Sequence, residues 1–167
     1  MTAIKRIAFA TIALAVALAL ATVNPASALA RTPGPAVPFQ SRSSGTTTFH
    51  KEDGTLTGEE SGVSSQLGKV TIQYQNATGT IDEHGVIKFQ GELTAVAANG
   101  DQLTGSFETT GDITKQTSKV KITGGTGRFA DATGEITVVC ITVGTPKVTQ
   151  DTVSIERECT GTGELSF

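Results

Sequence analysis

The 167-residue sequence has few of the side chains that most often carry catalysis or hold metals. It contains no tryptophan, one tyrosine, two histidines (His50 and His84) and two cysteines (Cys140 and Cys159). The cysteines lack the C-x-x-C spacing of a zinc site, and the histidines lie far from them and from each other. A Gly-x-Ser-x-Gly motif and a recognisable triad spacing around either histidine are also absent. We therefore predict neither a metal nor a cofactor, and the sequence assigns no catalytic residue.

Positive charge is not in excess, since 13 Lys and Arg stand against 16 Asp and Glu, for a net charge of −3 at pH 7. A mildly acidic surface repels phosphate groups, because like charges face each other across the contact. We therefore expect no nucleic-acid partner.

Charged residues are missing altogether from positions 7–23, which are apolar, follow a basic pair at 5–6 and precede alanines at 26, 28 and 30. This pattern is typical of a secretory signal peptide over residues 1–30. Both Ala26-Ser27-Ala28 and Ala28-Leu29-Ala30 fit the small-x-small rule of a cleavage site, and cleavage after Ala30 is preferred. The alternative is a membrane anchor, but the apolar run is short for a span and no positive cluster follows it. We expect no stable membrane anchor and a secreted protein, either extracellular or periplasmic.

Residues 31–43 are rich in Pro, Ser and Arg, which predicts a flexible linker before a single domain at 44–167. No segment beyond it has helical periodicity over even ten residues. Short runs of alternating apolar and polar residues recur instead, separated by Gly, Asn and Asp. The expected strands are 46–51, 57–63, 69–75, 86–97, 102–109, 118–123, 135–143 and 152–167. About eight such strands with short connections predict an all-β, eight-stranded antiparallel up-and-down barrel, or failing that a sandwich.

A glycine-rich run at 121–138 separates the sixth and seventh expected strands. A phosphate-binding loop would need a helix after it and a Gly-Lys-Ser/Thr ending, and the sequence has neither. A corner of the barrel explains the run better, because glycine allows sharp turns and close backbone approach. We expect a short helical turn at 128–132 that places Phe129 across the barrel end as a plug. The residues of this structural motif are Gly124, Gly125, Gly127, Phe129 and Gly134.

The motif Gly-Gly-Thr-Gly-Arg-Phe followed by Ala-x-Ala-x-Gly resembles one shared by allene oxide cyclases, plant dirigent proteins and secreted bacterial proteins with an allene oxide cyclase-like barrel. The segments LGKVT at 67–71 and ANGDQL at 98–103 resemble the bacterial group in the same order. The resemblance covers most of residues 57–138 and implies an eight-stranded antiparallel barrel of the calycin type. Many bacterial relatives read Thr-His-Leu-Gly where this chain has SQLG at 65–68, so no role of that histidine transfers. The matching residues belong to turns and packing, and no catalytic residue of the cyclases or dirigent proteins can be matched.

Arg157 is the most informative polar residue, because strict alternation places it on the apolar face of the last strand with Ile155 and Cys159. An inward arginine needs a carboxylate, carbonyl groups or an anionic ligand. The preferred interpretation is a bulge or a barrel mouth, where the stem is buried and the guanidinium reaches water. Tyr74 and Asn76 share the apolar face of their strand and are expected to line the same mouth. The candidate ligand-binding residues are Tyr74, Phe89, Phe107 and Arg157.

Three further polar residues are interpreted as structural. His84 lies in a turn and His50 on the outer face of the first strand, opposite in direction to Phe49. Asp131 is interpreted as a cap or turn residue that accepts backbone hydrogen bonds.

An even cysteine count in an exported chain predicts one disulfide, Cys140 to Cys159. Antiparallel pairing of the last two strands then places Val138 opposite Gly161 and Ile136 opposite Gly163. Glycines in these positions leave room beside the apolar side chains.

Three functions are compatible with this sequence. The first is a secreted barrel that binds a small apolar ligand or a macromolecular partner without catalysis. The alternative is a cyclase or isomerase, similar to allene oxide cyclases or dirigent proteins, that folds a reactive substrate inside the barrel; orientation supplies much of such catalysis. The third is a structural envelope or matrix protein. Whether the chain is an enzyme, and its oligomeric state, are left open by the sequence.

Overall fold

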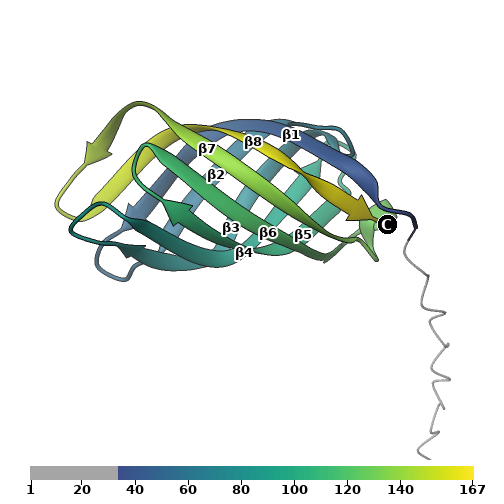
Figure 1. Cartoon of the computed structure of the whole chain (residues 1–167), viewed down its shortest axis with the longest axis horizontal. Coiled ribbons are helices and arrows are strands. Elements are labelled where there is room, and N and C mark those ends of the chain that lie inside the picture. Colours follow the sequence, from purple (N-terminus) through teal and green to yellow (C-terminus); the bar gives the residue numbers. More distant parts are fainter. Residues whose placement is uncertain (1–33) are drawn as a thin grey trace, which may run out of the picture. The chain divides into compact units, whose positions relative to one another are not determined.

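A computed structural model describes residues 34–167, and the predicted signal peptide with its cleavage site lies outside the described residues. The described chain forms a closed barrel of eight strands in which each strand is antiparallel to the next and the last pairs with the first (Figure 1). The predicted all-β up-and-down barrel is therefore confirmed. The elements are β1 (Val37–His50), β2 (Leu56–Ser64), β3 (Gly68–Ile81), β4 (Ile87–Ala97), β5 (Gln102–Gly111), β6 (Lys115–Gly125), the short 3₁₀ turn η1 (Gly127–Phe129), β7 (Thr133–Val148) and β8 (Thr152–Ser166).

The first strand begins well before the predicted start of the domain. Residues 37–43, which the sequence assigns to a flexible linker, form the first half of β1 and pair with β8 from Val37↔Leu165 onward. Phe39 in this segment is buried. The linker prediction is corrected here: barrel closure needs a partner along the whole of β8, since an unpaired edge would leave its backbone polar groups unsatisfied.

The two ends of the barrel are built differently. At the hairpin end, short turns at 51–55, 82–86, 112–114 and 149–151 join successive strands. Asp53, Asp82 and Asp112 accept backbone N–H hydrogen bonds from two residues further on, at 2.7–3.0 Å, which stabilises three of these turns. At the opposite end, here called the η1 end, the turns at 65–67 and 98–101 lie with η1 and the C-terminus (Figure 1).

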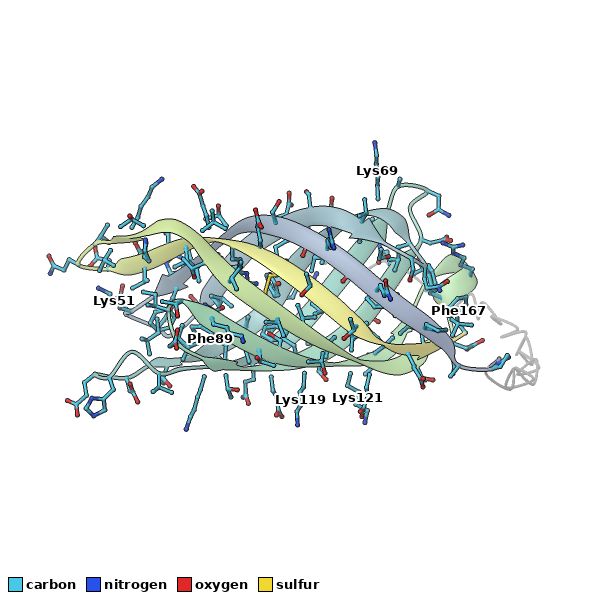
Figure 2. The ribbon with its side chains drawn as sticks, turned by 45° about the horizontal axis from the view of Figure 1, so that its top comes forward. Lys51, Lys69, Phe89, Lys119, Lys121 and Phe167 are labelled. Atoms are coloured by element: carbon cyan, nitrogen blue, oxygen red, sulfur yellow. A yellow bond between two sulfur atoms is a disulfide. The ribbon has the colours of Figure 1, made fainter. Side chains whose placement is uncertain are left out.

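The expected inward and outward faces are largely observed. Figure 2 shows Lys69, Lys119 and Lys121 pointing away from the barrel, whereas Phe89 is buried. One exception is Asn76, whose φ of 49° marks a register shift between β3 and β4. This bulge turns Asn76 outward, where its side chain bonds Glu92 at 3.1 Å, and turns Ala77 inward. Asn76 therefore does not share the inner face with Tyr74, because a bulge interrupts the two-residue period.

The glycine-rich run is a corner of the barrel, as predicted. Its turn is η1, which begins one residue before the expected turn at 128–132 and is shorter, and it carries Phe129 to a fully buried position. The Phe129 ring packs edge-on against Phe167 with centroids 5.0 Å apart. Gly127 has a φ of 59°, and a Cβ at this position would lie 1.9 Å from a carboxylate oxygen of Asp101. Only glycine fits there without displacement of its neighbour.

The predicted disulfide and its register are both confirmed. Cys140 and Cys159 lie opposite each other on β7 and β8, with their sulfurs bonded at 2.05 Å. The same ladder places Val138 opposite Gly161 and Ile136 opposite Gly163. Both cysteines are buried in the lumen, so the bridge joins the strands from inside the barrel.

Candidate functional site

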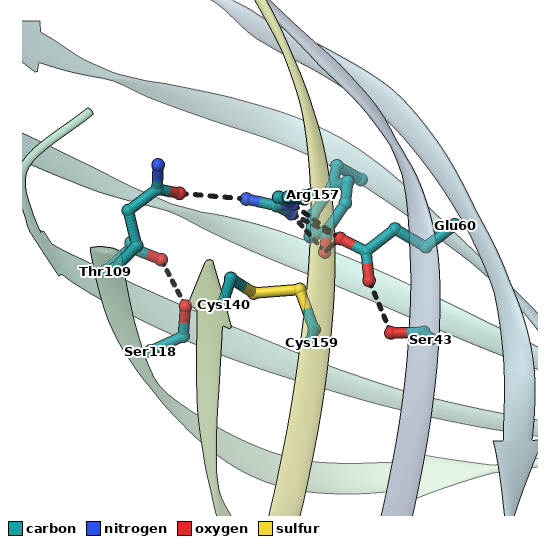
Figure 3. Close-up of a disulfide and its surroundings, with 9 residues drawn as sticks. Ser43, Glu60, Thr109, Ser118, Cys140, Arg157 and Cys159 are labelled. Carbon is teal, nitrogen blue, oxygen red and sulfur yellow. Dashed lines mark hydrogen bonds and ion pairs between the residues drawn. A yellow bond between two sulfur atoms is a disulfide. The ribbon is translucent and has the colours of Figure 1, made fainter. Parts of the chain in front are cut away.

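A layer of polar side chains crosses the barrel interior and divides it in two. This polar layer consists of Glu60, Tyr74, Gln116 and Arg157. Figure 3 labels Glu60 and Arg157 of this layer. On its hairpin side the interior is almost filled, with a residual cavity of about 10 Å³. On its η1 side lies a cavity of about 70 Å³, here called the lumen chamber. The lumen chamber is the candidate site, because it is the larger inner space and borders the buried charges.

The ladder register explains why a cation from β8 meets an anion from β2. Gly45 on β1 lies opposite Glu60 on one side and opposite Arg157 on the other. Side chains at facing positions point to the same side of a sheet, so both point into the lumen on either side of Gly45. A Cβ on Gly45 would lie 2.7 Å from the Glu60 Cα and 2.9 Å from its Cγ. The absent side chain of Gly45 therefore leaves the space in which the two charged groups meet.

All three guanidinium nitrogens of Arg157 donate hydrogen bonds inside the barrel. Its Nε donates to Glu60 Oε1 at 2.8 Å, and its Nη2 lies 2.5 Å from the same oxygen. Nη2 also donates to the Tyr74 hydroxyl at 2.6 Å, and Nη1 donates to Gln116 Oε1 at 3.1 Å. Glu60 accepts two further bonds, from the Tyr74 hydroxyl at 2.6 Å and from Ser43 Oγ at 2.7 Å. Within residues 34–167, no fully buried side-chain polar atom lacks a partner, as burial of charge requires.

These contacts set the protonation states of the layer. Burial raises the pKa of Glu60, but the charge of Arg157 and hydrogen bonds from Tyr74 and Ser43 outweigh it, so the pKa lies below its ordinary value. Burial raises the pKa of Tyr74 well above its ordinary value, against the opposing charge of Arg157. At neutral pH Glu60 is therefore ionised and Tyr74 protonated. Neither group is poised to exchange a proton near neutrality, as a general acid or base must be.

The four candidate ligand-binding residues fall on different sides of the polar layer. Tyr74 and Phe107 line the lumen chamber and pack edge to face with centroids 5.4 Å apart. Phe89 lies on the hairpin side, against Phe49 at 5.3 Å. Arg157 is inside the barrel and only 5% exposed, so the barrel-mouth interpretation is wrong. Its partner is a carboxylate of the chain itself, which was the other interpretation of an inward arginine.

The lumen chamber has apolar walls with a few hydroxyl groups. Ser64 Oγ accepts the Leu67 N–H at 2.9 Å, and Ser118 Oγ shares a 2.6 Å hydrogen bond with Thr109. In the described part of the chain, Ser41 Oγ makes no side-chain hydrogen bond although it borders the chamber. The arrangement can hold a small apolar molecule with one hydrogen-bonding group. The apolar lining comprises Phe39, Leu67, Val70, Ile72, Leu93, Ala95, Leu103, Phe107, Val120, Ile122, Ile136 and Val138.

Sequence reasoning missed Glu60, Gln116 and Ser41. A two-residue period counted from Leu56 puts Glu60 inside and Glu59 outside, so the signal for Glu60 was present. Gln116 precedes the start expected for its strand. Ser41 lies in the segment assigned to a linker, where no alternation was sought.

The remaining polar candidates lie outside the lumen. His50 Nε2 is 3.2 Å from Thr57 Oγ1 on the outer face, and the His84 side chain is 79% exposed in a hairpin turn. Asp131 is exposed beside η1.

Potential ligand atoms of Glu60, Cys140 and Cys159 lie within 4.8 Å of one another. The disulfide uses both sulfurs and Arg157 occupies the carboxylate, so this cluster does not offer the free thiolates that a metal needs.

An open groove of about 1110 Å³ crosses the outside of the barrel over β7, β8, β1, β2, β3 and β4. It contains the exposed Val63 and Ile141 together with Arg42, Lys69 and Glu158. Its lining mixes apolar, hydroxyl and oppositely charged side chains, so the groove has no single chemical character that identifies a partner.

Among residues 34–167, no helix has the length and apolar character needed to cross a membrane. Comparison of the chain with protein-family models, with curated proteins and with solved structures finds no match.

Proposed function

We propose that this protein is a non-catalytic binding barrel that encloses one small, mostly apolar molecule in the lumen chamber. The observation that carries this proposal is an inner cavity of about 70 Å³ with apolar walls and a polar layer at one end. Small-molecule sites in proteins have this composition: mostly apolar, with a few placed polar groups.

The volume of the chamber limits the size of its occupant. Sites for drug-sized ligands measure about 300–1,000 Å³, and an engineered apolar cavity that binds benzene measures about 150 Å³. A chamber of about 70 Å³ suits a molecule smaller than benzene. This favours ligand binding over a cyclase that folds a long substrate, because such a substrate needs room for its whole chain.

The protonation states also favour binding over catalysis. Glu60 and Arg157 neutralise each other and share hydrogen bonds with Tyr74, so each charged group already has its partners. A reaction that moves protons would need one of these groups to titrate near neutral pH, and the pKa of Glu60 is lowered while that of Tyr74 is raised.

Export is part of what we propose. The pattern at residues 1–30 supports it, and a disulfide is typical of oxidising compartments. Intact-mass measurement of secreted protein should then find an N-terminus within residues 27–31. Relationship to the bacterial proteins with allene oxide cyclase-like barrels stays a prediction, supported by the eight-stranded closed barrel with one turn between β6 and β7.

Titration with small neutral probes, followed by amide shifts in two-dimensional NMR, tests the proposed function. Acetone and acetamide are suitable probes. Very small ligands gain at most about −1.5 kcal/mol per non-hydrogen atom, or about −6 kcal/mol for these two molecules, so we expect dissociation constants of tens of micromolar or weaker. Shifts should centre on residues that line the chamber, such as Leu93 and Phe107.

A pair of neighbouring substitutions on β4 provides the control. Ala95 borders the chamber, whereas Val96 faces the outer groove. Ala95→Leu adds three carbons inside the chamber and should abolish binding, while Val96→Leu should leave it unchanged. Absence of saturable shifts in the unmodified protein, or equal binding by both variants, would show that the chamber is not the site.

A further inference from the structure

We infer that Glu60 determines the charge of the ligand: it occupies the anion position beside Arg157, so the lumen chamber accepts neutral molecules with a carbonyl or hydroxyl oxygen and rejects small carboxylates. This inference rests on the proposed function and adds the chemical class of the ligand.

The first observation is the order of the groups along the barrel axis. Glu60 and Tyr74 border the lumen chamber, whereas Arg157 borders the small cavity on the hairpin side of the polar layer. The Glu60 carboxylate thus stands between the chamber and the guanidinium, with Ser43 bonded to its second oxygen (Figure 3). A ligand in the chamber meets the carboxylate before it reaches the cation.

The second observation is that the Glu60–Arg157 pair leaves no charge for a ligand to neutralise. Nε and Nη2, which lie along one edge of the guanidinium, both face Glu60 Oε1. These are the donors that a free carboxylate would use in a two-pronged contact. An anion added to the chamber would be a buried charge without a partner, which is strongly unfavourable.

The third observation is a hydroxyl group with spare hydrogen-bonding capacity. Ser41 lies opposite Gly161 on β8, and its Oγ is 2.5 Å from the place where a Cβ on Gly161 would be. The side chain therefore leans over the glycine, at the border of the chamber. Its O–H can donate to a carbonyl or hydroxyl oxygen of the ligand, at the strength of a bond between neutral groups.

Removal of the Glu60 side chain should reverse this selectivity. In Glu60→Ala the space of the carboxylate joins the chamber, Arg157 Nε loses its acceptor, and Nη2 keeps only the Tyr74 hydroxyl. Acetate can then enter as the missing carboxylate and bond the same guanidinium edge. Acetone and acetamide have nearly the same size and shape as acetate but no charge, so the three form a matched probe set.

The experiment compares the unmodified protein, Glu60→Ala and the control Glu59→Ala, whose side chain is exposed on the outer face of β2. NMR titrations with the three probes are run at pH 7, together with thermal unfolding in sodium acetate and in sodium chloride of equal concentration. We expect the unmodified protein and Glu59→Ala to bind acetone and acetamide at least about ten-fold more tightly than acetate, a difference of about 1.4 kcal/mol. Glu60→Ala should prefer acetate, and acetate but not chloride should raise its melting temperature.

The outcomes separate the two proposals. If the neutral probes bind the unmodified protein and acetate does not stabilise Glu60→Ala beyond chloride, the role of Glu60 is wrong and the proposed function stands. If no neutral probe binds but Glu60→Ala captures acetate, the chamber is not a ligand site although Glu60 blocks the anion position.

If Glu60→Ala fails to fold in chloride, refolding in acetate tests the inference instead. Recovery of the folded variant in acetate supports the inference, and no recovery overturns it. Glu60→Gln, which keeps the volume but not the charge, should show weaker acetate rescue because the space stays filled.

Discussion

Replacement of Arg157 by methionine should destabilise the barrel through the carboxylate that it leaves behind. Glu60 is 2% exposed, and both the Nε and the Nη2 of Arg157 contact its Oε1. Removal of one partner of a buried ion pair costs about 3–5 kcal/mol, because the other charge stays buried without compensation. Since domains are stable by only about 5–15 kcal/mol, Arg157→Met should lose a large part of the free energy of unfolding at neutral pH.

The pH dependence of this loss has a definite sign. In the unmodified protein the pKa of Glu60 is lowered from 4.5, so its contribution to stability is present above 4.5 and is lost as the pH falls through the folded value. In Arg157→Met burial is left as the dominant influence and raises the pKa of Glu60, so protonation favours the folded state. The variant should therefore regain stability as the pH falls through that raised pKa. The difference in free energy of unfolding between the unmodified protein and Arg157→Met should therefore become smaller on acidification from about pH 8 to about pH 5.

A double variant identifies the cause of the loss. Arg157→Met with Glu60→Leu removes both charges, and apolar pairs that replace buried ion pairs are often neutral or stabilising by about 1–4 kcal/mol. Urea unfolding followed by circular dichroism measures the free energy of unfolding of the unmodified protein, the single variant and the double variant. Glu156→Ala, at an outward-facing position of β8, is the control. The double variant should recover most of the stability that the single variant loses. The reasoning is refuted if the single and double variants lose the same free energy of unfolding and if the difference from the unmodified protein does not shrink at low pH. The destabilisation would then come from lost packing alone.

Three other predictions concern the frame around the chamber. Gly45→Ala should cost about 1–3 kcal/mol in urea unfolding, because its Cβ would lie 2.1 Å from the Glu59 carbonyl oxygen, and Ser44→Ala on the outer face should be near neutral. Phe129→Ala should cost about 3–5 kcal/mol, the usual range for a fully buried aromatic; a change below about 0.5 kcal/mol would show that η1 does not close the barrel. Reduction of the disulfide between residues 140 and 159 should cost about 3 kcal/mol for its sequence separation of 19, and non-reducing peptide mass spectrometry should find the two peptides linked.

Much of the fold follows from local features that the sequence displays directly. Side chains alternate between the two faces of a strand by backbone geometry, so runs such as 69–75 and 102–109 revealed their inner faces without any knowledge of the neighbouring strands. The corner around Phe129 was readable from its glycines, since few other residues adopt the required backbone. The pairing of β7 with β8 was readable too, because one disulfide sets the register of a whole antiparallel ladder.

The candidate site depended on contacts between strands that are distant in the sequence. Glu60 and Arg157 are 97 residues apart and meet only because Gly45 lies between them in the closed barrel. Alternation indicates that a side chain points inward, but its partner depends on the registers of two ladders at once and on bulges such as the one at Asn76. The chamber volume is likewise a small difference between the space that eight strands enclose and the side chains that fill it. For these reasons the sequence determined the barrel, its disulfide and its η1 corner, whereas only the tertiary structure decided which charges are paired and how much room is left beside them.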